Sequence, residues 1–223
     1  MPIKTYTVAD GLPRDNVQKI IQDSRGFMWF CTSDGISRFE GYSFTNFTIY
    51  DGLPDRHIND LLETRSGTVW IATDNGLARL NPTGLAGSKE QPLFTTFLPA
   101  DPRAKKIFVL FEDQAGTIFV GSENGLYKLS EQDELEELDL GKPLPNVTSF
   151  VITSIIRDRR GAMWIGTGDS GVIRIQPDGS VEHFTMLNGL PGNDVASLIE
   201  DTNGRLWVGL RPGIFNDGLC LLS

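Results

Sequence analysis

The chain has 223 residues, of which 39% are hydrophobic and 22% are charged, and this composition is typical of a globular protein and excludes a disordered tail. Its formal net charge of −9 repels nucleic acid and anionic membranes at long range, so neither is an expected partner. Its two cysteines, Cys31 and Cys220, are too few for a disulfide framework. We expect no membrane insertion and no signal peptide, because no apolar run reaches about 18 residues and the first residues lack a basic region followed by an apolar one.

A sequence pattern is repeated five times along the chain. The first copy contains the segment QDSRGFMW, which starts at Gln22 and ends at Trp29. Each copy has a glycine at the same place, and these are Gly26, Gly67, Gly116, Gly161 and Gly204. Successive copies are therefore 41, 49, 45 and 43 residues apart. A period in this range indicates a solenoid or a propeller.

Each copy predicts four short strands in the same order, here termed a to d. Strand a, at residues 17–22 in the first copy, ends in an Asp-x-x-Gly turn, in which glycine supplies the left-handed backbone conformation. Strand b is predicted at residues 27–32, 68–73, 117–122, 162–167 and 205–210. Strand c, as at residues 36–39, alternates apolar and polar side chains. Strand d is the least uniform and is clearest at residues 43–50.

The apolar spacing within strand a is also compatible with a helix. Val17, Ile20 and Ile21 are three and then one residue apart, and the same spacing recurs in every copy. We expect a strand, because the segment has only about six residues before its turn and because adjacent apolar residues in a strand occupy opposite faces. The inner strands of a propeller blade bury both faces.

The period and the strand order predict an all-β fold, a single β-propeller segment over residues 1–223. An N-terminal outer strand is expected at residues 3–8. The blades are expected at about residues 14–50, 55–98, 104–140, 147–186 and, incomplete, 192–223. The outer strand could pair with the last blade and close a five-bladed ring, which would cover an open sheet edge. A partial arc of a larger propeller, such as a seven-bladed one, agrees equally well with the sequence.

Two sets of repeated residues have a structural interpretation. The bulky aromatic residue of strand b is expected to fill the wedge between consecutive blades as Trp29, Trp70, Phe119, Trp164 and Trp207. The turn aspartates are Asp23, Asp113, Asp158 and Asp201, with Thr64 in the second copy. Carboxylates repeated at a turn are typical of turn formation, since a catalytic pair would break the symmetry of the repeats.

The sequence contains no recognisable catalytic or metal-binding pattern. Its two histidines, His57 and His183, do not have the spacing of metal ligands, and no nucleophile elbow, phosphate-binding loop or kinase motif is present. We therefore expect no catalytic residue, no metal site, no cofactor and no enzymatic activity.

The repeats resemble the two-component regulator propeller family, whose pattern is roughly GLPxxxVxxIxxDxxGxxWIGTxxGLxRF. The first copy matches this pattern from Gly11 to Phe39. Further matches begin at Gly52, Leu144 and Gly189. The third copy departs from the pattern, with Phe119 in place of tryptophan and Asp101-Pro102-Arg103 in place of Gly-Leu-Pro. The resemblance covers nearly the whole chain.

The resemblance implies a periplasmic sensor region of a bacterial two-component or hybrid regulator, of which this chain would be the opening blades of the first propeller. In such proteins two propellers and a small β-sandwich pass a signal to an output inside the cell, and several members sense oligosaccharides. The implied partners are an oligosaccharide ligand and downstream signalling domains that lie outside this chain. Two other functions stay open. The blades could bind protein partners or self-associate without a ligand site of their own, or, more remotely, act as an enzyme similar to sialidases or streptogramin lyases.

The residues just before strand a differ most between the copies. In a propeller the d-to-a and b-to-c loops share one face, and the d-to-a loops approach the central axis. We therefore predict that a polar ligand is bound there by Asp15, Asn16, Arg56, His57, Lys105, Lys106, Asn193 and Asp194. Four of them, Arg56, His57, Lys105 and Lys106, would form a cationic sector suited to a carboxylated or sulfated sugar.

Overall fold

The computed structural model describes residues 3–81, 92–141, 150–211 and 218–222. The regular structure in these ranges is β-strand, apart from four single-turn 3₁₀ helices. The chain divides into two compact units, Met1–Glu112 and Asp113–Ser223. In the described ranges, no helix has the length and apolar character needed to cross a membrane.

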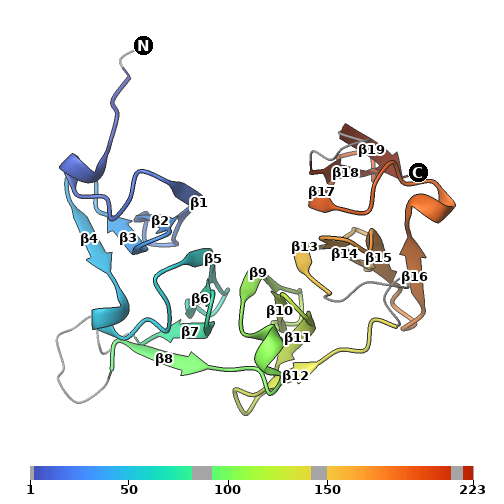
Figure 1. The fold of residues 1–223 in the computed structure, drawn as a ribbon, viewed down its shortest axis with the longest axis horizontal. Coiled ribbons are helices and arrows are strands. Elements are labelled where there is room, and N and C mark those ends of the chain that lie inside the picture. The colour runs from blue at the N-terminus through green and yellow to red at the C-terminus, as the bar shows by residue number, and fades with distance from the viewer. Residues whose placement is uncertain (1–2, 82–91, 142–149, 212–217, 223) are drawn as a thin grey trace. The chain divides into compact units, whose positions relative to one another are not determined.

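The first unit contains two complete blades and one further strand. Blade 1 is an antiparallel sheet in the order β1 (Val17–Gln22), β2 (Met28–Thr32), β3 (Gly35–Phe39) and β4 (Phe44–Phe47). Blade 2 has the order β5 (Ile58–Glu63), β6 (Val69–Thr73), β7 (Gly76–Leu80) and β8 (Phe94–Phe97), and β9 (Ile107–Glu112) follows. The first strands lie side by side, because β1 contacts β5 and β5 contacts β9, whereas β4 and β8 lie away from them (Figure 1).

The second unit repeats this arrangement. It begins with the antiparallel strands β10 (Ile118–Ser122), β11 (Gly125–Leu129) and β12 (Leu135–Glu137). Blade 4 has the order β13 (Ile152–Arg157), β14 (Met163–Thr167), β15 (Val172–Ile175) and β16 (Val181–Phe184). Blade 5 has the order β17 (Val195–Glu200), β18 (Leu206–Leu210) and β19 (Gly218–Leu222). The all-β propeller architecture and the strand order a to d predicted from the repeats are confirmed.

A β-bulge explains the helix-like spacing in the first strand of blades 1, 2, 4 and 5. Ile58 pairs with Thr73 but Asp60 pairs with Ala72, so one extra residue lies between them, and equivalent register shifts occur in β1, β13 and β17. An extra residue reverses which face the following side chains occupy. Ile58 and Leu61, three residues apart, are therefore both buried, at 0% and 2% exposure. The strand prediction was right, and the bulge is the reason for its unusual spacing.

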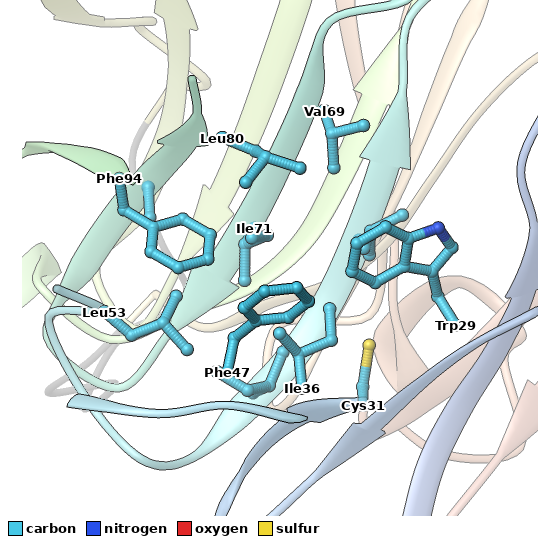
Figure 2. Packing of buried hydrophobic residues seen from close by; sticks show 12 residues of the cluster. Trp29, Cys31, Ile36, Phe47, Leu53, Val69, Ile71, Leu80 and Phe94 are labelled. Atoms are coloured by element: carbon cyan, nitrogen blue, oxygen red, sulfur yellow. The ribbon is translucent and has the colours of Figure 1, made fainter. Parts of the chain in front are cut away.

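The repeated aromatic residues fill the space between consecutive blades. Trp29 is completely buried, and its ring stacks on Phe47 with ring centroids 5.9 Å apart. Both rings belong to one buried cluster with side chains of blade 2, among them Ile71, Leu80 and Phe94 (Figure 2). Trp70, Phe119 and Trp164 are also buried, whereas Trp207 is only half-buried. The core prediction is thus confirmed for four blades, and Trp207 is a weaker case.

The Asp-x-x-Gly turns also orient the tryptophans. In the first turn the Gly26 N–H donates to the Asp23 carbonyl at 2.9 Å, and the φ of Gly26 is 90°. All five turn glycines have φ between 78° and 90°, namely Gly26, Gly67, Gly116, Gly161 and Gly204. Asp23 Oδ2 in addition accepts a hydrogen bond from the indole Nε1 of Trp29 at 3.0 Å. The same bond joins Asp158 to Trp164 at 2.8 Å and Asp201 to Trp207 at 3.0 Å.

Two predicted strands differ from the structure. Residues 3–7 have no regular structure and Val8 begins the 3₁₀ helix η1 (Val8–Asp10), so the N-terminal outer strand at residues 3–8 is absent. Strand d of blade 1 ends at Phe47, and η2 (Ile49–Asp51) follows it. The two 3₁₀ helices are formed by the same motif. Thr-x-x-Asp-Gly forms a capping box, in which the hydroxyl of Thr7 or Thr48 accepts a backbone N–H and the aspartate accepts the threonine N–H.

Candidate functional site

The loop before each first strand is fixed to the preceding blade through its backbone. The N–H of Gly35, in the b-to-c turn of blade 1, donates to the Arg56 carbonyl at 2.7 Å. Gly76 donates in the same way to Lys105 at 2.7 Å, and Gly171 donates to Asn193 at 2.9 Å. The glycine is required, because a Cβ at Gly35 would lie 2.4 Å from the Phe47 carbonyl oxygen. Within each unit, the d-to-a loop of one blade therefore lies beside the b-to-c turn of the blade before it.

Two of the eight predicted ligand residues hold the loop itself. Asp15 Oδ1 accepts the N–H of Val8 at 2.7 Å, and Asn193 Oδ1 accepts the N–H of Met186 at 2.8 Å. Both donors are the first residue of a 3₁₀ helix, η1 or η4 (Met186–Asn188). These side chains satisfy a helix N–H that has no partner inside the helix.

Three more predicted residues lie beside a charged side chain. Lys106 Nζ lies 3.0 Å from Asp74 Oδ2, and Arg211 Nη1 lies 3.7 Å from Asp194 Oδ1. His57 Nδ1 lies 3.4 Å from Asp55 Oδ1. Of the other predicted residues, Asn16 is exposed and Lys105 is half-buried. Acidic side chains therefore lie beside Lys106 and His57 at the start of β9 and β5, where the cationic sector is predicted.

Arg56 lines a cavity. This cavity has a volume of about 360 Å³ and lies at the junction of blades 1 and 2. Its lining residues are Pro13, Asp34, Asn46, Thr48, Ile49, Tyr50 and Arg56. The volume falls in the range of about 300–1,000 Å³ that is common for small-molecule sites. A polar ligand of the size of one sugar residue would fit it.

Internal hydrogen bonds hold part of the cavity wall. Asn46 Nδ2 donates to the Gly11 carbonyl at 2.8 Å, and Asn46 Oδ1 accepts the hydroxyl of Ser37 at 2.6 Å. The hydroxyl of Thr48 takes part in the capping box of η2. Asp34 Oδ2 lies 3.6 Å from Arg14 Nε. Tyr50 is 94% exposed.

Four residues that line the cavity were not predicted from the sequence, namely Asp34, Asn46, Thr48 and Tyr50. Asp34 lies in the b-to-c turn and Tyr50 lies in η2. The sequence signal for them is the prediction that the d-to-a and b-to-c loops lie on the same face. The variable columns before strand a were not sufficient, because five of the seven lining residues belong to the preceding blade.

Cys31 lies in the core below these loops, close to the ion pair of Lys19 with Asp60. Burial raises the pKa of the Asp60 carboxyl, although Lys19 lowers it in part. Burial and the nearby Asp60 raise the pKa of Cys31 to about 12, so this residue is a neutral thiol at pH 7 and a poor nucleophile.

Neither histidine lies in a metal cluster. His183 Nε2 hydrogen-bonds to the Leu140 carbonyl at 3.0 Å. In the described part of the chain, no three His, Cys, Asp or Glu side chains are grouped as metal ligands.

The family profile described as Two component regulator propeller matches residues 11–34, 52–75, 147–169 and 189–211. These segments begin blades 1, 2, 4 and 5. The third repeat, in which Phe119 replaces tryptophan, is not matched. No curated protein matches the chain.

Several solved structures share the fold. The extracellular domain of the hybrid two component system BT3049 from B. thetaiotaomicron has a TM-score of 0.77 and 23% identity, with 99% of this chain and 30% of that chain covered. The extracellular domain of the one component system BT4673 from the same organism has a TM-score of 0.75 and 19% identity, with 99% and 28% covered. Virginiamycin B lyase from Staphylococcus aureus has a TM-score of 0.65 and 17% identity, with 85% and 61% covered.

The chain spans less than a third of the two extracellular domains that it resembles. At these identities the likeness establishes the propeller fold. Four repeats of this chain are two-component regulator propeller repeats.

Proposed function

We propose that this chain is a non-enzymatic, ligand-binding propeller segment in the extracellular, periplasmic input region of a two-component regulator. The family match and the likeness to extracellular domains of such systems support the class of protein. The observation that carries ligand binding is the cavity at the junction of blades 1 and 2, which Arg56 lines. An oligosaccharide is the proposed ligand, and downstream signalling domains are the proposed recipients of the signal.

The position of the cavity suggests how binding could be transmitted. Asp34 and Tyr50 come from blade 1 and Arg56 precedes β5 of blade 2, so a bound ligand would touch both blades. The backbone bond from Gly35 to Arg56 joins the same two blades. A ligand that binds one arrangement of this junction more tightly shifts the population toward it. Such a shift is the physical form that a sensor signal would take here.

The test is a binding screen with the purified chain. Oligosaccharides from several polysaccharides are titrated by calorimetry, first into the wild type and then into Arg56→Ala and Lys106→Ala variants. We expect saturable binding of at least one oligosaccharide and a loss of affinity in Arg56→Ala. Unchanged affinity of both variants for every oligosaccharide would remove the pocket from the proposal, and no binding at all would contradict ligand sensing by this segment.

A separate assay tests the non-enzymatic part of the proposal, because virginiamycin B lyase shares the fold. The chain is incubated with virginiamycin B and the products are followed by mass spectrometry. We expect the substrate to stay intact. Ring opening above the rate of a buffer control would contradict the proposal.

A further inference from the structure

One position before the first strand has a different role in blade 2 from the role it has in blades 1 and 5. Asp15 and Asn193 occupy this position in blades 1 and 5, and each accepts the first N–H of a 3₁₀ helix. Arg56 occupies the position in blade 2. Arginine carries only donors, so it cannot accept that N–H. The residue in blade 2 therefore does not serve the structural purpose of its counterparts.

The loop around Arg56 is nevertheless built like the others. Thr48 and Asp51 form the same capping box as Thr7 and Asp10, and Gly52 has a φ of 101°. Among the described residues, the Arg56 guanidinium has no side-chain hydrogen bond and no ion pair, and it lines the cavity. An exposed guanidinium that the fold does not use is available to a ligand.

The rest of the cavity has the chemistry of a sugar site. Tyr50 presents an aromatic ring that is 94% exposed on the short helix η2, so its apolar face can cover the C–H face of a sugar ring. The carboxylate of Asp34 can accept hydrogen bonds from hydroxyl groups. Asn46 and Thr48 are already hydrogen-bonded within the protein and act as a fixed wall.

The positively charged guanidinium of Arg56 favours a negatively charged ligand. Arginine binds carboxylates and sulfates through two parallel N–H···O bonds. The net charge of −9 opposes any anion at long range, so the attraction has to come from this local donor group. A neutral sugar would gain much less from the free guanidinium.

We infer that the cavity at the junction of blades 1 and 2 is a subsite for an anionic sugar residue, whose carboxylate or sulfate binds Arg56 while its ring packs on Tyr50. This inference rests on the proposed function, and it adds the charge of the ligand and the residues that bind the charged sugar. Arg56 is the residue that distinguishes an acidic sugar from a neutral one.

The experiment titrates acidic sugars and their uncharged counterparts into the intact chain. The probes are trisaccharides of galacturonate, glucuronate and mannuronate, the methyl esters of the same trisaccharides, and sulfated disaccharides. The esters are matched controls, because they keep the ring and lose the charge. A carboxylate preference and a sulfate preference are distinguished by which acidic probes bind.

The variants separate charge from geometry. Arg56→Gln removes the charge, Arg56→Lys keeps the charge without the planar fork, and Tyr50→Ala removes the ring. Lys128→Gln is the control, because Lys128 is a half-exposed cation paired with Glu136 in the second unit. Circular dichroism and urea midpoints establish that each variant is folded before it is titrated.

We expect at least one acidic probe to bind the wild type, with its methyl ester at least tenfold weaker. Arg56→Gln should weaken the acidic probe at least tenfold and leave the ester unchanged, and Arg56→Lys should give an intermediate loss. Equal binding of acid and ester, or an unchanged Kd in Arg56→Gln, would overturn the inference. If neutral oligosaccharides bind and are insensitive to Arg56, the proposed function stands and only this inference fails. If no saccharide binds, both fail.

Discussion

The junction of blades 1 and 2 in the first unit and the junction of blades 4 and 5 in the second unit are built on one plan. In each, a turn glycine donates to a loop carbonyl, at 2.7 Å to Arg56 and at 2.9 Å to Asn193. In each, a threonine caps a 3₁₀ helix and a tryptophan fills the wedge. The side chain just before the first strand has a different role in the two junctions, since Asn193 holds the helix and Arg56 lines a cavity. The backbone fixes the loop in both cases, which leaves that side chain free to acquire another role.

A second contrast lies on the opposite face, where the Asp-x-x-Gly turns are. Glu63 accepts the backbone N–H of Ser24 at 2.6 Å, and Glu200 accepts that of Arg159 at 3.0 Å. Arg157 stands at this position in blade 4, and its Nη2 lies 3.0 Å from Asp113 Oδ2. Phe119 in the third repeat lacks the indole N–H that Trp29, Trp164 and Trp207 donate to their turn aspartates, and Arg157 donates to Asp113 instead. The two departures from the repeat pattern therefore compensate for each other.

The largest predicted effect concerns the wedge residues. Trp29→Ala should destabilise the chain by about 3–5 kcal/mol, because it leaves a cavity at a fully buried position. Trp207→Ala should cost clearly less, because Trp207 is only half-buried. Urea unfolding followed by circular dichroism measures both. Equal losses would contradict the difference in burial.

The next largest loss of stability is expected at the turn carboxylates. Asp23→Ala should cost about 1–3 kcal/mol, because the N–H groups of Arg25, Phe27 and Trp29 lose their common acceptor. The matched control is Asp178→Ala, since Asp178 accepts only from Ser180 in an exposed turn. A loss at Asp23 no larger than at Asp178 would contradict the role of the indole bond.

The same carboxylate makes stability depend on pH. Burial by itself raises the pKa of Asp23, but the N–H donors of Trp29, Phe27 and Arg25 outweigh burial and bring the pKa below its ordinary value. Because the folded-state pKa is lowered, the ionised carboxylate stabilises the fold at pH values above the unfolded-state pKa of about 3.9. This stabilisation is lost as pH falls through the folded-state pKa. We expect the urea midpoint to drop on acidification below about pH 4, and to drop less in Asp23→Asn. An identical pH profile for that variant would contradict the assignment.

Exchange of the loop side chains tests the first contrast directly. Asn193→Arg should lower stability by about 1 kcal/mol, because the Met186 N–H loses its acceptor. Arg56→Asn should leave stability unchanged or raise it slightly, since asparagine can accept the helix N–H as Asn193 does, and it should weaken acidic-sugar binding. Urea midpoints and titration calorimetry give the two readouts. Loss of stability in Arg56→Asn would show that Arg56 is structural.

The smallest expected effect is the coupling of Asp113 with Arg157. A double-mutant cycle with alanine at both positions should give a coupling energy of about 0.5–1 kcal/mol, because the pair is only partly buried. The exposed pair Lys128 with Glu136 is the control and should give a smaller value. A coupling no larger than that of the control would contradict the compensation.

The repeat, the strand order and the wedge tryptophans can be predicted from the sequence alone. These features are set by short-range chemistry: turn glycines need positive φ, half-buried strands alternate, and a bulky ring such as Trp29 recurs wherever a wedge has to be filled. The sequence also identified the variable loop columns, because loop side chains are free of the packing that constrains the core.

Only the tertiary structure decided what each loop residue does. The bulge that puts Ile58 and Leu61 on one face becomes visible only when the neighbouring strand is paired with it. Likewise, Asn193 and Arg56 are equivalent in sequence position, and their roles separate only when the adjacent helix N–H and the cavity wall are in place. The role of a side chain depends on groups that folding brings close from distant parts of the chain. A periodic sequence pattern does not show which groups these are.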